Sequence, residues 1–263
     1  MTTIENDAPT EAPAKQPRRK AWLVVGGALT AVILLFVVAV AGVLIWSASS
    51  PRETDSRAQT YESVAGVDLD VAVGSVSLTG GDGAELSVES DMHWKGPEPQ
   101  VEEELTADGV FEARAQCGED YLFWLLGAQC EVDYSAAVPS GTPALVRTSV
   151  ADIDVDGLDG ELDIETTTGE VDARNLRTSD TSITSTTADV TVSFAELTGG
   201  VDISTTTGNV TVLVPDDGTA YEVRYDSTTG AEEIGIATDP SETNGQVIDV
   251  TTTTGNLEVR YVS

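Results

Sequence analysis

The hydrophobic pattern divides the chain into one continuous apolar run and a long region of alternating positions. Residues 21–46 (AWLVVGGALTAVILLFVVAVAGVLIW) carry no charge, and Thr30 is the one clearly polar side chain among them. At 1.5 Å per residue, a helix of this length spans about 39 Å, enough to cross the roughly 30 Å hydrocarbon core of a bilayer. A soluble helix would show a polar stripe. The run therefore predicts one transmembrane α-helix, with the lipid bilayer as its partner.

The residues around this run indicate its orientation. Positive charges precede it and tryptophans bracket it, as expected at the two membrane interfaces. The candidate interface residues are Arg18, Arg19, Lys20, Trp22 and Trp46. The positive-inside rule predicts a single-pass protein of the cell membrane, with a cytoplasmic N-terminus and an extracellular C-terminal domain. A cleaved signal peptide is the alternative, because small residues follow the run, although its apolar region would be only about 7–15 residues long.

Composition subdivides the rest of the chain. Residues 1–20 are rich in Ala, Pro and Thr and predict a disordered cytoplasmic tail. Residues 47–62 (SASSPRETDSRAQTYE) predict a polar stalk. We expect residues 63–263 to form the extracellular domain.

That domain contains an internal repeat, which is the most informative feature of the sequence. Segments such as IETTTGEVDA (Ile164–Ala173), ITSTTADVTV (Ile183–Val192) and ISTTTGNVTV (Ile203–Val212) align on a small residue after a Thr/Ser run. The predicted repeat corners are Gly74, Ala151, Gly169, Ala188, Gly208, Gly230 and Gly255, the first in an isolated early copy. Successive anchors from Ala151 onward lie about 20 residues apart.

The pattern within each copy predicts two β-strands joined by a corner. Apolar and polar residues alternate with period two, which is typical of strands. The parity of the apolar positions changes at the corner: Ile164 precedes it on one parity, and Val171 and Ala173 follow it on the other. We therefore predict an all-β ectodomain, a parallel β-solenoid or β-helix-like stack of about six coils, preceded by one transmembrane helix. An antiparallel sandwich is the alternative.

Residues 79–145 interrupt the repeat and contain the two cysteines of the chain. Cys117 and Cys130 enclose the segment CGEDYLFWLLGAQC, and in an exported domain we expect them to form a disulfide. The enclosed loop is apolar, and its candidate interaction residues are Tyr121, Phe123, Trp124 and Leu125. Such a loop either covers the open first coil or presents an apolar patch to a partner.

Charge excludes several classes of function. The chain has 45 acidic and 13 basic side chains, for a formal net charge of −32, which argues against nucleic-acid binding. One histidine and two cysteines leave no His-rich or Cys-rich metal site, and we expect no cofactor. Residues 1–20 are slightly basic, so all the excess negative charge lies after the apolar run.

Weaker motifs were weighed against simpler explanations. The pattern D-x-D-x-D-G at 152–157 resembles half of a calcium loop, with candidate ligands Asp152, Asp154, Asp156 and Asp163. Because Ile153 and Val155 fit the inward face of a strand, we expect an acidic outer face there and no metal site. Polysaccharide-cleaving enzymes also use β-helices, but no carboxylate pair stands out, so we predict no catalysis. Threonine ladders also occur on ice-binding solenoids, although acidic residues interrupt the runs here.

The ectodomain resembles a known bacterial family. VPSGTPALVRTSVADIDVDGLDGELDIETTTGEVDA (Val138–Ala173), the T-T-G-x-V units after it, and VPDDGTAYEVRYDSTTG (Val214–Gly230) are similar to a putative-adhesin domain of unknown function with β-strand repeats. The resemblance covers roughly Val64–Ser263. It implies a β-helix-like stack, often behind an N-terminal membrane helix, and it brings no catalytic residues.

Two functions are compatible with these features. The first is a membrane protein that displays an acidic extracellular repeat domain as an adhesin-like or envelope-interaction module. The second is an envelope sensor that signals through its helix to the short N-terminal tail. The envelope or surface partner itself cannot be read from the sequence.

Overall fold

The computed structural model describes residue 30 and residues 32–42, 51–118, 129–239 and 246–262. The chain forms two compact units, Met1–Ser49 and Ser50–Ser263. In the first unit, residue 30 and residues 32–42 are helical, whereas the tail and the other positions of the predicted transmembrane run lie outside the described residues. Within the described ranges, no helix is both long enough and apolar enough to span a membrane.

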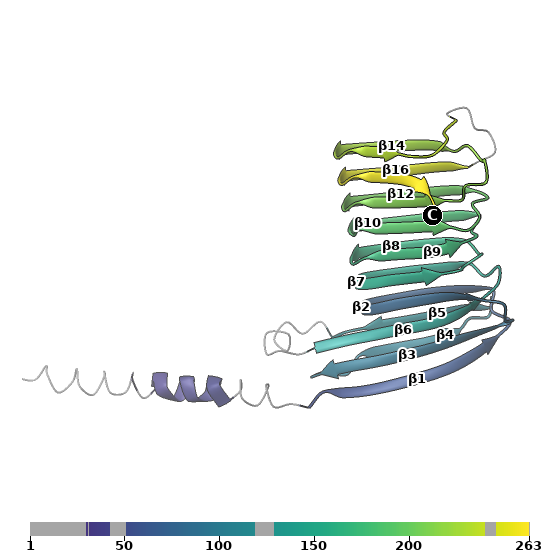
Figure 1. Ribbon diagram of the computed structural model, residues 1–263. Coiled ribbons are helices and arrows are strands. Elements are labelled where there is room, and N and C mark those ends of the chain that lie inside the picture. The colour runs from purple at the N-terminus through teal and green to yellow at the C-terminus, as the bar shows by residue number, and fades with distance from the viewer. Residues whose placement is uncertain (1–29, 31, 43–50, 119–128, 240–245, 263) are drawn as a thin grey trace, which may run out of the picture. The chain divides into compact units, whose positions relative to one another are not determined.

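The described part of the second unit is built from β-strands. In the repeat region each coil places one strand in a front sheet and the next in a back sheet, and equivalent strands of neighbouring coils pair in parallel (Figure 1). These pairings confirm the predicted parallel β-solenoid and show that it has two faces. They contradict the antiparallel sandwich for the repeats.

Each sheet follows the stack from one end to the other, and β2 and β7 continue round the corner into both sheets. The front sheet contains, in spatial order, β4 (Gln100–Leu105), β5 (Val110–Gln116), β2 (Gly66–Gly81), β7 (Ala144–Asp156), β8 (Leu162–Thr168), β10 (Asp180–Thr187), β12 (Gly200–Thr207), β16 (Val247–Thr254) and β14 (Glu222–Thr229). The back sheet contains β1 (Glu53–Glu62), β3 (Glu85–Lys95), β6 (Gln129–Pro139), β2, β7, β9 (Val171–Leu176), β11 (Val190–Phe194), β13 (Val210–Val214), β17 (Leu257–Tyr261) and β15 (Glu232–Ile234).

The core lies between the two sheets and follows from the period of two. Ile164, Ile183 and Ile203 pair in register on β8, β10 and β12, and all three are fully buried. Val192 and Val212 on β11 and β13 are also fully buried, in the back sheet. Burying one such side chain contributes about 1.5–3 kcal/mol, so repetition of the same two columns stabilises the whole stack.

Antiparallel strands close the N-terminal end of the stack. β1 pairs with β3, β3 with β6, and β4 with β5, all in antiparallel register. The predicted polar stalk is therefore wrong over residues 53–62, which form β1. Its side chains are almost all exposed, so no apolar alternation marked it as a strand, and backbone pairing with β3 holds it in place.

The last two coils are exchanged relative to their order in the sequence. β16 lies between β12 and β14, and β17 lies between β13 and β15 (Figure 1). Burial explains the exchange. Ile248 and Leu257 of the inserted coil are at most 1% exposed, whereas all three residues of β15 are exposed. The more apolar coil occupies the interior position, and the polar coil covers the end, as the terminal coil of a solenoid must.

Candidate functional site

The predicted corner residues lie one above another along one side of the solenoid. A Cβ atom on Gly169 would come within 1.8 Å of the Ala151 carbonyl oxygen, and one on Gly208 within 1.7 Å of the Ala188 carbonyl oxygen. Both glycines have positive φ, 150° and 146°. The corner column runs in the order Gly74, Ala151, Gly169, Ala188, Gly208, Gly255 and Gly230.

Two exposed residues per coil precede this column and form a surface that we call the threonine edge. Both are exposed because the chain changes parity there: Thr166 points inward, Thr167 and Thr168 point outward, and Val171 points inward again. The threonine edge comprises Ser149, Val150, Thr167, Thr168, Thr186, Thr187, Thr206, Thr207, Thr253, Thr254, Thr228 and Thr229, all of them exposed. Ten of its twelve residues are threonines, and none is charged.

A column of buried hydroxyl groups supports the threonine edge from inside the corner. Thr148 Oγ1 donates to Thr166 Oγ1 at 2.8 Å, and Ser185 Oγ donates to Thr205 Oγ1 at 2.8 Å. Further along the same column, the Thr252 hydroxyl is buried without a hydrogen-bond partner. The paired hydroxyls satisfy polar groups that would otherwise be costly to bury, and they fix the strands on which the edge residues stand.

A hollow of about 480 Å³ lies beside the threonine edge on the front sheet. It crosses four neighbouring strands of the stack, from β2 to β10. Its lining combines hydroxyl and charged groups, namely Asp70, Arg147, Thr148, Ser149, Glu165, Thr166, Thr167, Thr184, Ser185 and Thr186. Arg147 is the one cation in this lining, and its guanidinium lies 2.9 Å from Asp68 Oδ1 and 3.7 Å from Glu165 Oε2.

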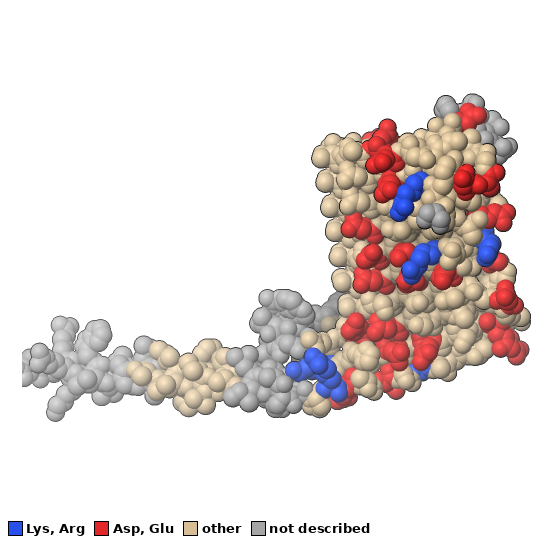
Figure 2. Space-filling view, in the orientation of Figure 1, with Lys and Arg blue, Asp and Glu red and all other residues tan. Residues whose placement is uncertain are grey.

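Charge separates the threonine edge from its surroundings. Figure 2 shows the edge as a tan band along the left side of the stack, next to a sheet face that carries many acidic side chains. In the described part of the chain, arginines of the repeat coils lie next to carboxylates, as Arg174 does beside Asp154 and Asp172. The hydrogen bond to Asp154, followed by the charge of Asp172, raises the pKa of the Arg174 guanidinium. The faces are thus acidic with neutralised arginines, and the edge is uncharged.

Sequence reasoning missed a second column, made of Asx side chains directly after the corners. Asp189 Oδ1 accepts the backbone N–H of Asn209 at 2.7 Å, and Asn209 Oδ1 accepts the backbone N–H of Asn256 at 3.1 Å. Asn256 Oδ1 then accepts the backbone N–H of Ala231 at 2.9 Å. Recurrence of Asp or Asn directly after the corner residue in several copies was the available signal. The column ends at Ala231, which has no side-chain acceptor for a further coil.

The geometry does not assemble the calcium candidate. Asp152, Asp154 and Asp156 project outward from β7, a regular strand of the back sheet, whereas Asp163 belongs to β8 in the front sheet. Asp154 contacts Arg174, and Asp156 accepts a hydrogen bond from Asn175 at 2.8 Å. Within the described ranges, no three His, Cys, Asp or Glu side chains are grouped to hold a metal ion.

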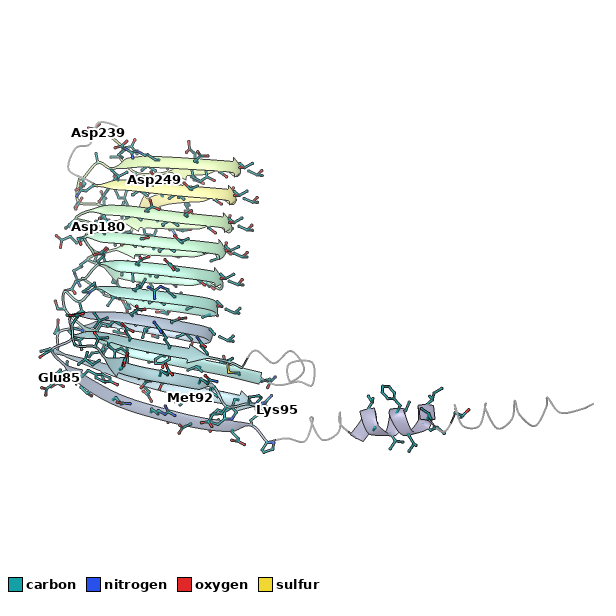
Figure 3. All side chains as sticks on the ribbon, turned by 180° about the vertical axis from the view of Figure 1, so that it is seen from behind. Glu85, Met92, Lys95, Asp180, Asp239 and Asp249 are labelled. Carbon is teal, nitrogen blue, oxygen red and sulfur yellow. A yellow bond between two sulfur atoms is a disulfide. The ribbon has the colours of Figure 1, made fainter. Side chains whose placement is uncertain are left out.

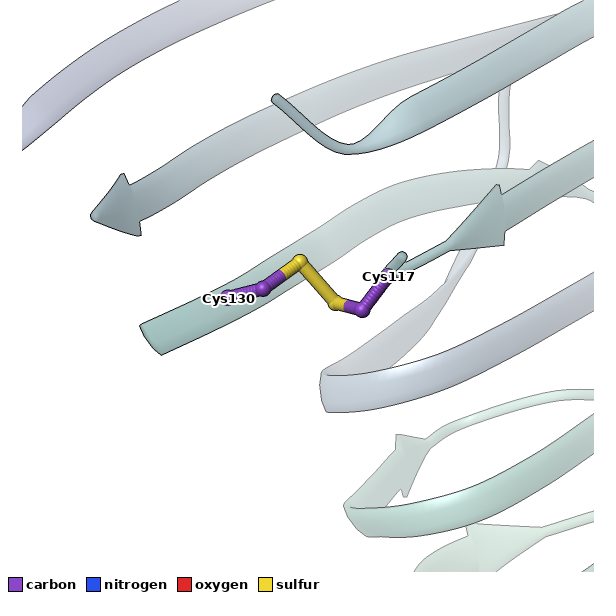
Figure 4. The surroundings of a disulfide bond; sticks show 2 residues. All are labelled: Cys117 and Cys130. Atoms are coloured by element: carbon purple, nitrogen blue, oxygen red, sulfur yellow. A yellow bond between two sulfur atoms is a disulfide. The ribbon is translucent and has the colours of Figure 1, made fainter. Parts of the chain in front are cut away.

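Cys117 and Cys130 form the predicted disulfide, with their Cα atoms 5.8 Å apart (Figure 4). The apolar loop candidates Tyr121, Phe123, Trp124 and Leu125 lie outside the described residues, as do Arg18, Arg19, Lys20, Trp22 and Trp46. The strands of the antiparallel region, rather than that loop, are what the structure places over the first coil.

A smaller polar cluster lies at the N-terminal end of the stack. Tyr134 on β6 donates its hydroxyl hydrogen to Glu103 on β4 at 3.0 Å, and Gln59 on β1 donates to the same carboxylate at 3.2 Å. Burial, followed by the charge of Glu103, holds the pKa of the Tyr134 hydroxyl far above its usual range. The neighbouring β3 runs from Glu85 to Lys95 and directs Met92 into the core (Figure 3). This network closes the end of the core with polar groups.

The family assignment rests on the repeat region. Residues 141–260 match the family model described as Toastrack DUF4097. This chain contains a Toastrack domain. The match covers the coils from β7 to β17, so the columns described above are features of the Toastrack domain together with the coil of β2. No curated protein matches the sequence.

Solved structures with a similar arrangement come from anaerobic bacteria. A putative cell adhesion protein from Clostridium sporogenes is 13% identical, with a TM-score of 0.48 over 80% of this chain and 100% of the other. A putative adhesin from Bacteroides fragilis is also 13% identical, with a TM-score of 0.42 over 80% of this chain and 97% of the other. A putative lipid binding protein from Parabacteroides distasonis is 7% identical, with a TM-score of 0.35 over the same two shares. All three TM-scores lie below 0.5, and they carry no inference about function.

Proposed function

We propose that the protein is a non-catalytic, adhesin-like display module, anchored in the cell membrane by residues 21–46 and exposed outside the cell. The observation that carries this proposal is the threonine edge. It is a long, exposed and uncharged surface on a chain whose net charge is −32, and it repeats from coil to coil. A surface of this kind suits recognition of an extended partner.

The anchor and its orientation are supported by the sequence. The uncharged apolar run is long enough for a bilayer, and four basic residues precede it within residues 1–20. A rigid two-sheet stack directly after the anchor would hold its surface away from the membrane. Under this proposal the acidic faces keep the domain soluble and reduce adsorption to anionic polymers.

The chain offers a direct test of this topology, because Lys95 is the only lysine after residue 20. A membrane-impermeant amine reagent applied to intact cells should modify Lys95 and leave Lys15 and Lys20 unmodified, as read by mass spectrometry. The K95R variant is the matched control and should lose the extracellular label. Labelling of Lys15 and Lys20 with protection of Lys95 would contradict the proposal.

Adhesion is tested separately on the same cells. Cells that display the wild-type protein should attach to a polysaccharide-coated or cell-coated surface more than cells without it. Deletion of residues 2–14 should leave attachment unchanged, since a display protein does not need its tail. A stress-response phenotype that disappears on this deletion, without an adhesion phenotype, would favour the sensor instead.

A further inference from the structure

We propose that the threonine edge, with the hollow beside it, binds an uncharged linear polysaccharide whose chain lies along the axis of the stack. This inference rests on the proposed display function and names the chemical class of its partner. The chemistry of the surface is the first argument. Threonine hydroxyls donate and accept hydrogen bonds, and their methyl groups contact apolar C–H surfaces. A neutral polysaccharide offers hydroxyl groups and C–H faces in the same alternation.

The dimensions of the surface favour a linear polymer over a folded protein. The edge crosses six coils, and strands of one sheet lie about 4.8 Å apart, so it is about 24 Å long. It is only two residues wide, far below the area of about 800 Å² per partner that stable protein interfaces bury. A polysaccharide chain is narrow enough for this surface and long enough to contact several coils together.

The hollow indicates the direction of the ligand. It extends across β2, β7, β8 and β10, which is along the stack and not along a strand. Ser149, Thr167 and Thr186 of the threonine edge line it together with hydroxyls of the inner column. Equivalent hydroxyl groups therefore recur in the hollow once per coil, and a polymer with a regular repeat can contact them in the same way at each step.

Rigidity and charge define the ligand further. Threonine is branched at Cβ and has few rotamers, so little side-chain entropy is lost when the ligand binds. Acidic residues lie beside the edge, including Asp70 and Glu165 in the lining of the hollow, and Arg147 is already paired. An anionic polymer would meet uncompensated repulsion there. The surface thus selects for an uncharged chain.

Retention of the full-length protein, kept in mild detergent, on insoluble polymers tests this inference. We expect retention on cellulose or chitin, which are neutral, and at least tenfold weaker retention on carboxymethyl cellulose, which has the same backbone with added charge. Absence of retention on both neutral polymers would overturn the inference, and so would equal retention on the charged one. Arrest of ice-crystal growth without retention on any polymer would identify a different ligand and would also overturn it.

Variants locate the site. The double variant T186V/T206V keeps the side-chain shape and removes two edge hydroxyls, and T186E/T206E places charges there. Each should reduce retention about tenfold or more, the equivalent of one or two hydrogen bonds. The matched control is T60E, an exposed threonine on β1 away from the edge. Unchanged melting temperatures show that the variants are folded. Retention that the edge variants leave intact would contradict the proposed site.

The outcomes of this test and of the function test are distinguishable. Extracellular labelling of Lys95 and cell attachment, without retention on neutral polymers, would refute the ligand and leave the display function standing. Intracellular Lys95 would refute the display function, whatever the purified protein binds.

Discussion

Single residues decide whether the chain can turn at the corners of this Toastrack domain. Gly208 has a φ of 146°, and a Cβ atom there would lie 1.7 Å from a backbone oxygen of the neighbouring coil. Neither the backbone conformation nor the contact can relax without separating two coils. Ala151 and Ala188 are tolerated in the same column because neither has a positive φ. The stack thus alternates two local solutions to one turn.

We expect the G208A variant to lose about 3 kcal/mol or more of its free energy of unfolding, from backbone strain and overpacking combined. Chemical denaturation of the purified protein measures this loss. G83A is the matched control, because the nearest atom to its added Cβ lies 3.9 Å away, and its change should stay within about 0.5 kcal/mol. Equal effects of the two substitutions would contradict the corner geometry.

Asp159 gives a prediction about pH. Hydrogen bonds from the Ser140 hydroxyl and the Gly141 backbone N–H lower the pKa of its carboxyl group in the folded protein. A lowered pKa means that the carboxylate stabilises the fold above the pKa of the unfolded chain, near 3.9, and that this stabilisation disappears as the pH falls. The contribution is small, below about 1 kcal/mol, because the group is largely exposed.

The D159N and S140A variants should therefore be slightly less stable than the wild type at neutral pH. The difference in free energy of unfolding should vanish as the pH is lowered through the carboxyl pKa. A difference that grows on acidification would show the opposite sign of linkage and would rule out this account of Asp159.

At the scale of elements, alternation of apolar residues made the repeat strands predictable. The strand–corner–strand unit, the parallel stack and the corner residues all follow from period-two patterning and from the change of parity at each corner. β1 was not predictable in this way, because its residues are exposed and polar and backbone pairing alone defines it. The exchange of the last two coils was also hidden, because it depends on comparing the burial that each coil can provide.

That exchange predicts unequal costs for two substitutions in one column. Ile248 on β16 is fully buried, and its partner Val223 on the terminal strand β14 is only partly buried. The I248A variant should lose about 3 kcal/mol of stability and V223A less than about 1.5 kcal/mol, as measured by denaturation. If the coils were stacked in sequence order, β16 would be terminal and the ranking should reverse.

For the whole molecule, charge is the dominant feature that the fold must accommodate. The net charge is −32, and the described acidic side chains outnumber the arginines beside which they lie. Like charges on a compact body repel, and added salt screens that repulsion within about 10 Å at 0.1 M. We expect the melting temperature to rise as NaCl is increased from low concentration to 1 M. A fall would mean that attractive ion pairs outweigh the repulsion.

The candidate site could be predicted from the sequence only in part. The threonine runs indicated a ladder, and the structure divides it into an inner bonded column and an outer exposed edge. Which of three consecutive residues point outward depends on where the parity changes, and composition does not specify this. The hollow beside the edge requires side chains from β2, β7, β8 and β10 together, so no single copy of the repeat contains it.

The account as a whole depends on the corners and edge residues forming one column, with β16 between β12 and β14. Cysteine pairs test this most directly, because the two native cysteines are already joined. Neighbouring strands lie about 4.8 Å apart, within the Cα separation of a disulfide, whereas two strand spacings exceed its limit of about 7 Å. The pairs T206C/T253C and T253C/T228C should form intrachain disulfides under mild oxidation, and T206C/T228C should remain reduced. Linkage of Cys at 206 to Cys at 228, or failure of both neighbouring pairs, would contradict the stack described here.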